Sequence, residues 1–69
     1  MKISARNVLK GTVKSVTVGA VNDEIVIELP GGQEIVSVIT KNSAESLGLA
    51  PGKEAYAVVK ASNVMVMVD

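Results

Sequence analysis

Four residues near the start of the chain, Ser4-Ala5-Arg6-Asn7, have side chains well suited to binding a small anion. Arg6 offers a planar, permanently charged fork of hydrogen-bond donors. Ser4 and Asn7 place neutral polar groups beside it. This combination can hold an oxyanion by charge and by hydrogen bonds together.

Further donors occur later in the chain. The additional polar and cationic candidates are Thr40, Lys41, Asn42, Ser43, Lys60 and Ser62. Thr40–Ser43 lies where a short helix is predicted to begin, and free N–H groups at a helix start favour an anion. Capping explains Asn42 and Ser43 equally simply, because their side chains can satisfy those same N–H groups. For Lys60, the simpler interpretation is a strand residue with a solvated amine.

Other kinds of chemistry find little support in the composition. The chain has no cysteine and no histidine, which excludes disulfides and makes a zinc or copper site very unfavourable. General acid–base catalysis needs a carboxylate pair or a tuned lysine. The neighbours Asp23 and Glu24 point to opposite faces of a strand, so they form no such pair. We therefore predict a binding protein and not an enzyme.

Binding of single-stranded nucleic acid is the alternative function. Proteins of this kind stack bases on aromatic side chains and follow the backbone with positive charge. Tyr56 is the single aromatic residue of the chain, and the net formal charge is zero. Both features argue against this alternative.

Charge is nevertheless distributed unevenly along the chain. Residues 1–22 contain four cationic residues and no acidic one, whereas residues 23–69 contain three lysines against seven acidic residues. Such asymmetry can mark a surface that faces an anion. With only fourteen charges, chance distribution explains it equally well.

Five strands and one helix are predicted from alternation of apolar residues and from turn signals. The predicted strands span residues 7–18, 21–29, 33–40, 54–61 and 64–68. Pro30-Gly31-Gly32 forms the turn of a hairpin, and Ala61-Ser62-Asn63 forms another tight turn. The predicted helix spans residues 42–47, with Asn42 as its cap and Gly48 in the left-handed position after its end.

This order of elements predicts an all-β fold, a five-stranded OB-type β-barrel with one short helix between strands 3 and 4. An SH3-like barrel is the alternative. A chain of 69 residues forms one domain at most, with a small core. No apolar run approaches the length of a membrane-spanning helix, and no secretory signal is expected.

Several predicted strands are apolar on both faces. Every residue of Val64–Val68 is apolar, and Ala55, Ala57 and Val59 alternate with Tyr56 and Val58. A barrel strand with one solvated face should alternate more cleanly. Hydrophobic residues make up 48% of the chain, so we expect another copy of the same chain to cover the outer face. Burial within one subunit is the alternative.

The chain resembles the molbindins, small cytoplasmic molybdate-binding proteins made of a single Mop domain. The most specific similarity is the opening Ile3-Ser4-Ala5-Arg6-Asn7. The similarity continues, in order and over residues 1–69, through Lys10-Gly11, Pro30-Gly31-Gly32, Val38-Ile39-Thr40 with Ser43, Leu47-Gly48-Leu49, Gly52-Lys53 and Val59-Lys60-Ala61.

The resemblance implies a cytoplasmic homohexamer, a trimer of dimers, that binds molybdate or tungstate between subunits. It implies no enzymatic activity, no organic cofactor and no nucleic-acid or membrane partner. A lone copy of the domain is similar to the forms that serve molybdenum storage and homeostasis. A purely structural assembly domain without an anion remains a third hypothesis.

The resemblance also implies which residues bind the anion. Ser4, Arg6 and Lys60 are the expected donors from one subunit, with backbone N–H groups of Ala61 and Ser62 beside them. Thr40 and Ser43 are expected to come from a neighbour. A second site formed by backbone amides is expected near a symmetry axis, at Gly19, Ala20, Val21 and Asn22.

Overall fold

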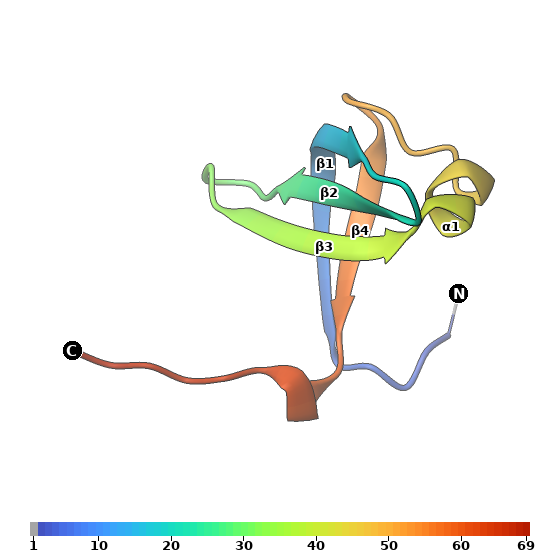
Figure 1. The fold of residues 1–69 in the computed structure, drawn as a ribbon. Coiled ribbons are helices and arrows are strands. Elements are labelled where there is room, and N and C mark those ends of the chain that lie inside the picture. Colours follow the sequence, from blue (N-terminus) through green and yellow to red (C-terminus); the bar gives the residue numbers. More distant parts are fainter. Residues whose placement is uncertain (1) are drawn as a thin grey trace.

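A computed structural model describes residues 2–69 as four strands, one α-helix and one 3-10 turn. In chain order the elements are β1 (Asn7–Val18), β2 (Asn22–Glu28), β3 (Glu34–Thr40), α1 (Lys41–Ser46), β4 (Glu54–Val59) and η1 (Ala61–Asn63). The strands form a single antiparallel sheet in the order β3-β2-β1-β4 (Figure 1). The prediction of a mainly β fold with one short helix is therefore confirmed.

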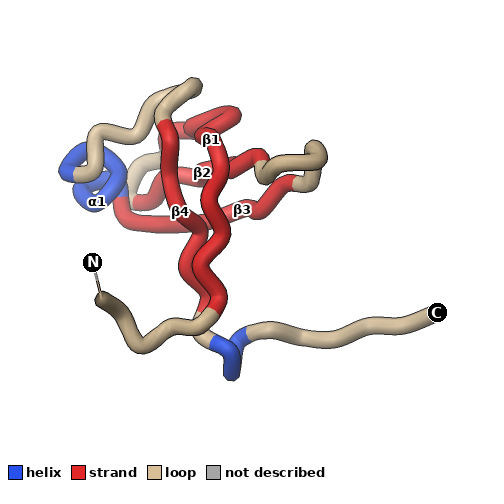
Figure 2. Tube along the Cα trace, turned by 180° about the vertical axis from the view of Figure 1, so that it is seen from behind, coloured by secondary structure: helices blue, strands red, loops and turns tan. Residues whose placement is uncertain are grey.

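The long strand β1 organises the sheet because its two halves pair with different partners. Asn7–Thr12 pairs with β4, and Thr12–Val18 pairs with β2. The register shifts between Val13 and Ser15, where Lys14 is an extra residue. Such a bulge bends a strand and increases its twist. The sheet consequently curls, and β2 and β3 cross the β1–β4 pair steeply (Figures 1 and 2).

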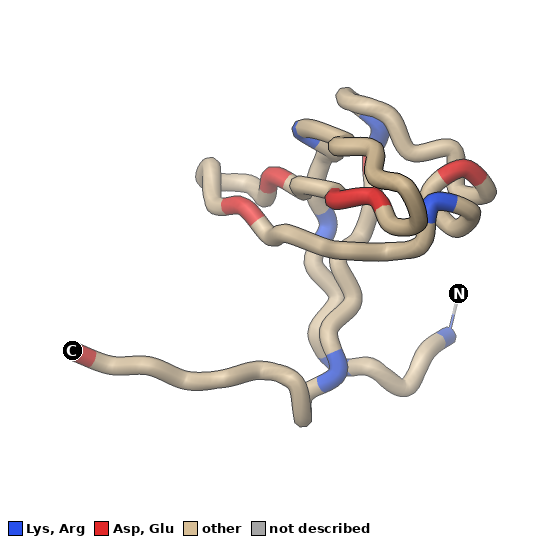
Figure 3. Tube along the Cα trace, in the orientation of Figure 1, with Lys and Arg blue, Asp and Glu red and all other residues tan. Residues whose placement is uncertain are grey.

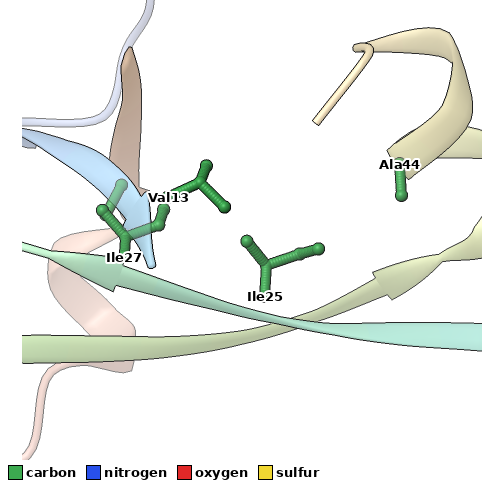
Figure 4. Close-up of a cluster of buried hydrophobic side chains, with 5 residues drawn as sticks. Val13, Ile25, Ile27 and Ala44 are labelled. Carbon is green, nitrogen blue, oxygen red and sulfur yellow. The ribbon is translucent and has the colours of Figure 1, made fainter. Parts of the chain in front are cut away.

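The hydrophobic core lies inside this curl. It contains Val13, Ile25, Ile27, Ala44 and Ala57, each at most 7% exposed. Figure 4 shows the side chains from β1 and β2 and that of Ala44, which α1 contributes from the end of the curl. The alternation of Ile25 and Ile27 along β2 places both on the inner face.

The helix starts one residue earlier than predicted and has a different cap. Thr40, not Asn42, is the N-cap residue of α1, and its Oγ1 accepts the N–H of Ser43 at 3.1 Å. The Thr40 hydroxyl also donates to Ser43 Oγ at 2.7 Å. The predicted left-handed residue after the helix is confirmed, because Gly48 has a φ of 64°. No helix within residues 2–69 is long and apolar enough to cross a membrane.

The prediction of a fifth strand at Val64–Val68 is wrong for the single chain. After β4 and the turn η1, this segment is extended but pairs with no strand of the described residues. It runs away from the sheet, as Figures 1 and 2 show. A strand needs hydrogen bonds to a neighbouring strand, and apolar alternation alone does not supply one. The sheet therefore has four strands and stays open between β3 and β4.

Candidate oxyanion-binding site

The first strand and the last strand bring the two ends of the chain together. Asn7 and Val59 are paired residues of β1 and β4, and Asn7 Nδ2 donates to the carbonyl oxygen of Val59 at 3.2 Å. Arg6 therefore emerges beside Lys60 at the end of this strand pair. A hollow of about 320 Å³ lies there, and it is lined by Ser4, Ala5, Arg6, Lys60, Ala61 and Ser62.

Five of the predicted donors thus meet at one surface site. Ser4, Arg6, Lys60, Ala61 and Ser62 were expected to share a site, and the structure brings them together although the two segments lie more than fifty residues apart. These five residues are all exposed in the single chain, so one side of the hollow faces solvent.

The hollow has positive charge that no ion pair among residues 2–69 offsets. Within residues 2–69, the ion pairs are Lys10 with Glu54 and Lys14 with Glu34, and neither involves Arg6 or Lys60. Figure 3 shows Lys and Arg positions where β1 begins and β4 ends, with others spread over the rest of the chain, whereas most acidic positions lie along β2, β3 and α1. Two uncompensated cations beside two serines are suited to a doubly charged oxyanion.

The backbone next to Lys60 can add donors to the hollow. Residues 61–63 form the 3-10 turn η1, in which the Asn63 N–H donates to the Lys60 carbonyl oxygen at 2.8 Å. The first N–H groups of such a turn have no partner within it. Ala61 and Ser62 occupy these first positions, so their N–H groups are available to a ligand in the hollow.

Thr40 and Ser43 lie at the other end of the sheet. Thr40 is paired with Asn22, next to the pair formed by Val18 and Asp23 at the far end of β1. Neither Thr40 nor Ser43 lines the hollow of Arg6 and Lys60. Within one chain both hydroxyls serve the start of α1, although the Ser43 hydroxyl proton is left free to donate because its oxygen is the acceptor.

The residues expected to form a second site make up the turn between β1 and β2. Gly19, Ala20 and Val21 are exposed there, as is Asn22 at the start of β2. Two backbone groups of this turn already have partners. The Gly19 N–H donates to Asp23 Oδ1 at 3.2 Å, and the Val21 carbonyl oxygen accepts the Lys41 N–H at 2.8 Å.

Sequence reasoning missed the role of Asp23. This carboxylate is 3% exposed and holds the turn by accepting the Gly19 N–H. The sequence contains a signal for this burial. The period-2 alternation that places Ile25 and Ile27 on the inner face also places Asp23 there. A buried acid at a strand start needs a donor, and the preceding turn supplies it.

Comparison with known proteins agrees with this description. The model of the TOBE domain matches residues 3–66. The chain is 48% identical to the probable molybdenum-pterin-binding protein of Haemophilus influenzae over 69 residues, which is all of both chains. Four of the other curated relatives are longer, and the chain spans only 24–26% of their length.

Solved structures show the same fold. A molybdate-binding protein from Sporomusa ovata superposes with a TM-score of 0.92 at 43% identity, covering 99% of this chain and 100% of that one. The cytoplasmic molybdate-binding protein ModG, with molybdate bound, gives a TM-score of 0.91 at 54% identity over 94% of this chain and 46% of its own length. From the family match and these relatives, the chain belongs to the TOBE domain family and, within it, to the molybdenum-pterin-binding (Mop) proteins, or molbindins.

Proposed function

We propose that this protein binds molybdate or tungstate at sites between the subunits of a homo-oligomer, and that it serves intracellular molybdenum storage and homeostasis. The observation that carries the proposal is the exposed hollow in which Arg6 and Lys60 meet. The names of the relatives from Haemophilus influenzae and Sporomusa ovata support molybdenum as the element bound.

The chemistry of the hollow fits a tetrahedral dianion. Arg6 and Lys60 offset two negative charges, while the hydroxyls of Ser4 and Ser62 and the amide of Ala61 donate to the remaining oxygens. A site built mainly of donors disfavours a protonated phosphate, because its own O–H group finds few acceptors there. Sulfate is a dianion like molybdate, so the size of the completed site must separate the two.

We place the boundary between subunits at the hollow, because in one chain the donors of the hollow face solvent on one side. The donors around Arg6 face solvent, and Thr40 and Ser43 present their hydroxyls at the far end of the sheet. A second copy placed with its α1 end against the hollow supplies the missing donors. Exposed apolar side chains are also more numerous than buried ones, which favours an assembly, for which we propose the homohexamer built as a trimer of dimers.

The ligand proposed is the bare oxyanion, with no organic cofactor. The residues that line the hollow are small or cationic, and none is aromatic. A pterin ring is bound most effectively by stacking on an aromatic face. We further propose that the protein is not an enzyme and acts in the cytoplasm, as the description of ModG as a cytoplasmic molybdate-binding protein suggests.

Equilibrium binding with elemental analysis tests the proposal. Arg6→Ala and Lys60→Ala should each weaken molybdate binding roughly 10- to 100-fold, the cost of losing one charged hydrogen bond. Lys10→Ala is the matched control, because Lys10 is an exposed lysine of β1 that pairs with Glu54, outside the hollow. Unchanged affinity in both site variants, or binding of a single-stranded oligonucleotide in place of molybdate, would contradict the proposal.

A further inference from the structure

The turn between β1 and β2 has a carboxylate of the chain itself beneath it. Asp23 is the one buried charged residue within residues 2–69, at 3% exposure. It pairs with Val18 where the two strands enter the turn. Its Oδ1 accepts the N–H of Gly19 at 3.2 Å. One oxygen of a negatively charged group therefore already occupies an amide donor of the turn.

No cation offsets this carboxylate. The ion pairs among residues 2–69 are those of Lys10 and Lys14, so neither involves Asp23. A hollow of about 190 Å³ lies beside it, between the end of β1 and α1, and its charged lining residues are Asp23, Lys41 and Glu45. Two carboxylates against one amine leave this end of the sheet with a net negative charge.

The turn is packed on both sides, so its amides keep their directions. The Val21 carbonyl oxygen accepts the N–H of Lys41 at 2.8 Å, which ties the turn to the start of α1. A Cβ atom at Gly19 would lie 2.3 Å from the Asn22 carbonyl oxygen, so these two residues are in close contact. The turn thus has little freedom to move the Gly19 N–H from Asp23 to another anion.

Such a turn is poorly suited to a second anion. A site made of backbone amides binds an anion through N–H groups that are free and converge on it. Here one N–H has a partner, and the carboxylate that holds it repels a dianion across a short stretch of weakly polar protein. The hollow of Arg6 and Lys60 has the opposite character, because two cations line it and no acid does.

We propose that Asp23 takes the place of a bound anion at this turn and excludes molybdate from Gly19–Asn22. The second site that the family resemblance implies is then closed in this chain, and the hollow of Arg6 and Lys60 is the class of site that fills. Asp23 is a specificity-determining residue that limits how many ions each subunit takes up. The inference rests on the proposed function of the hollow, but exclusion at the turn has a readout of its own.

Titration calorimetry with sodium molybdate at neutral pH, together with elemental analysis of molybdenum per subunit, tests the exclusion. Asp23→Asn keeps an oxygen for the Gly19 N–H and removes the charge, whereas Asp23→Ala also frees the N–H. Both variants should bind more molybdenum per subunit than the wild type. In an Arg6→Ala background, where the hollow is weakened, each should raise the molybdate affinity roughly tenfold or more.

The neighbouring acid supplies the matched control. Glu24→Gln removes the same charge one residue away, but Glu24 is exposed on the opposite face of β2. It should leave molybdenum per subunit at the wild-type value. Circular dichroism checks that the variants are folded. Wild-type binding in the folded Asp23 variants would overturn the proposal, as would an equal gain in Glu24→Gln.

A further variant locates the gained ion. Ala20 is exposed in the turn, so Ala20→Asp in the Asp23→Ala background returns a carboxylate to the same place without burying it. The additional molybdate binding should then disappear. Binding that survives this change belongs to another part of the protein and would also overturn the exclusion.

Failure of the hollow and failure of the exclusion give different results. Loss of affinity in Arg6→Ala with no gain in either Asp23 variant refutes the exclusion alone. A wild-type protein that binds no molybdate, while Asp23→Ala does, refutes the proposed function and supports the exclusion. Loss in Arg6→Ala and recovery in the double variant Arg6→Ala/Asp23→Ala supports both.

Discussion

Asn7 and Val59 are joined twice, as paired residues of β1 and β4 and through the Asn7 Nδ2 hydrogen bond to the Val59 carbonyl oxygen at 3.2 Å. Fifty-two positions separate them in the sequence. Arg6 precedes one partner and Lys60 follows the other, so this pair determines how closely the two cations approach. Asn7 is therefore a positioning residue for the proposed site.

Removing this side chain should weaken both the fold and the proposed site. Asn7→Ala should lower the free energy of unfolding by about 1 kcal/mol, the usual contribution of one hydrogen bond. Molybdate affinity should fall roughly fivefold if the hydrogen bond stabilises the molybdate-bound state by about 1 kcal/mol more than the free state. Calorimetric titration measures the affinity, with Gln33→Ala as a control at an exposed turn position. Wild-type affinity in Asn7→Ala would show that the strand pairing alone positions Arg6.

Substitutions at Thr40 can separate capping from anion binding. Thr40→Ala removes the N-cap of α1 and should cost about 1 kcal/mol of stability. Thr40→Asp keeps a capping oxygen and should preserve stability, but its negative charge should repel a dianion. Thermal unfolding and molybdate titration of both variants measure the two effects. If Thr40→Asp binds molybdate normally, Thr40 acts only as a cap.

Gly11 should be intolerant of any side chain. A Cβ atom at this buried position of β1 would lie 2.5 Å from the Glu28 carbonyl oxygen and 2.7 Å from Ile27 Cγ2. Gly11→Ala should destabilise the fold by about 3 kcal/mol, because the close neighbour is backbone of the paired strand. Gly31→Ala is the comparison, since it has open space and only the strain of its φ of 97°, which costs about 1 kcal/mol. Urea unfolding that ranks the two in reverse order would refute this account.

The ion pair between Lys14 and Glu34 should give a small pH dependence in alkali. The hydrogen bond with Glu34, and then its charge, raise the pKa of Lys14 above the ordinary value of 10.5. A raised folded-state pKa means that the pair contributes fully below pH 10.5 and that its contribution is lost as the pH rises through the folded-state value.

Thermal unfolding of the wild type and of Glu34→Gln measures this contribution. The difference in Tm between them should be constant near neutral pH and shrink above pH 10.5. Both side chains are substantially exposed, so the difference should be small and should fall further at high salt. A difference that grows with alkaline pH has the wrong sign for this pair.

Local features of the fold were predictable because they depend on neighbouring residues. Alternation along residues 21–29 predicted the strand Asn22–Glu28, and Pro30-Gly31-Gly32 predicted the turn that follows. Gly48 after α1 adopts the predicted left-handed conformation. The helix cap was predicted two residues too late, because Thr40 and Asn42 are both good caps and only the register of β3 decides between them.

The fifth strand shows why a pattern of residues is not enough. Val64–Val68 has strand composition, but a strand also needs a partner, and the backbone of η1 carries this segment away from β3 and β4. Composition predicted that another copy of the chain covers part of the apolar surface. Where that surface lies, as an open groove and a projecting segment, follows only from how the sheet curls.

For the candidate site, the sequence by itself determined which residues we propose as donors. Ser4, Arg6, Lys60 and Ser62 were identified by their chemistry and by the family resemblance, without coordinates. Tertiary structure alone decided which of them meet, because the pairing of Asn7 with Val59 joins opposite ends of the chain. It also decided that Thr40 and Ser43 lie at the far end of β1, since strand register places residues by distance along the sheet and not by chemical type.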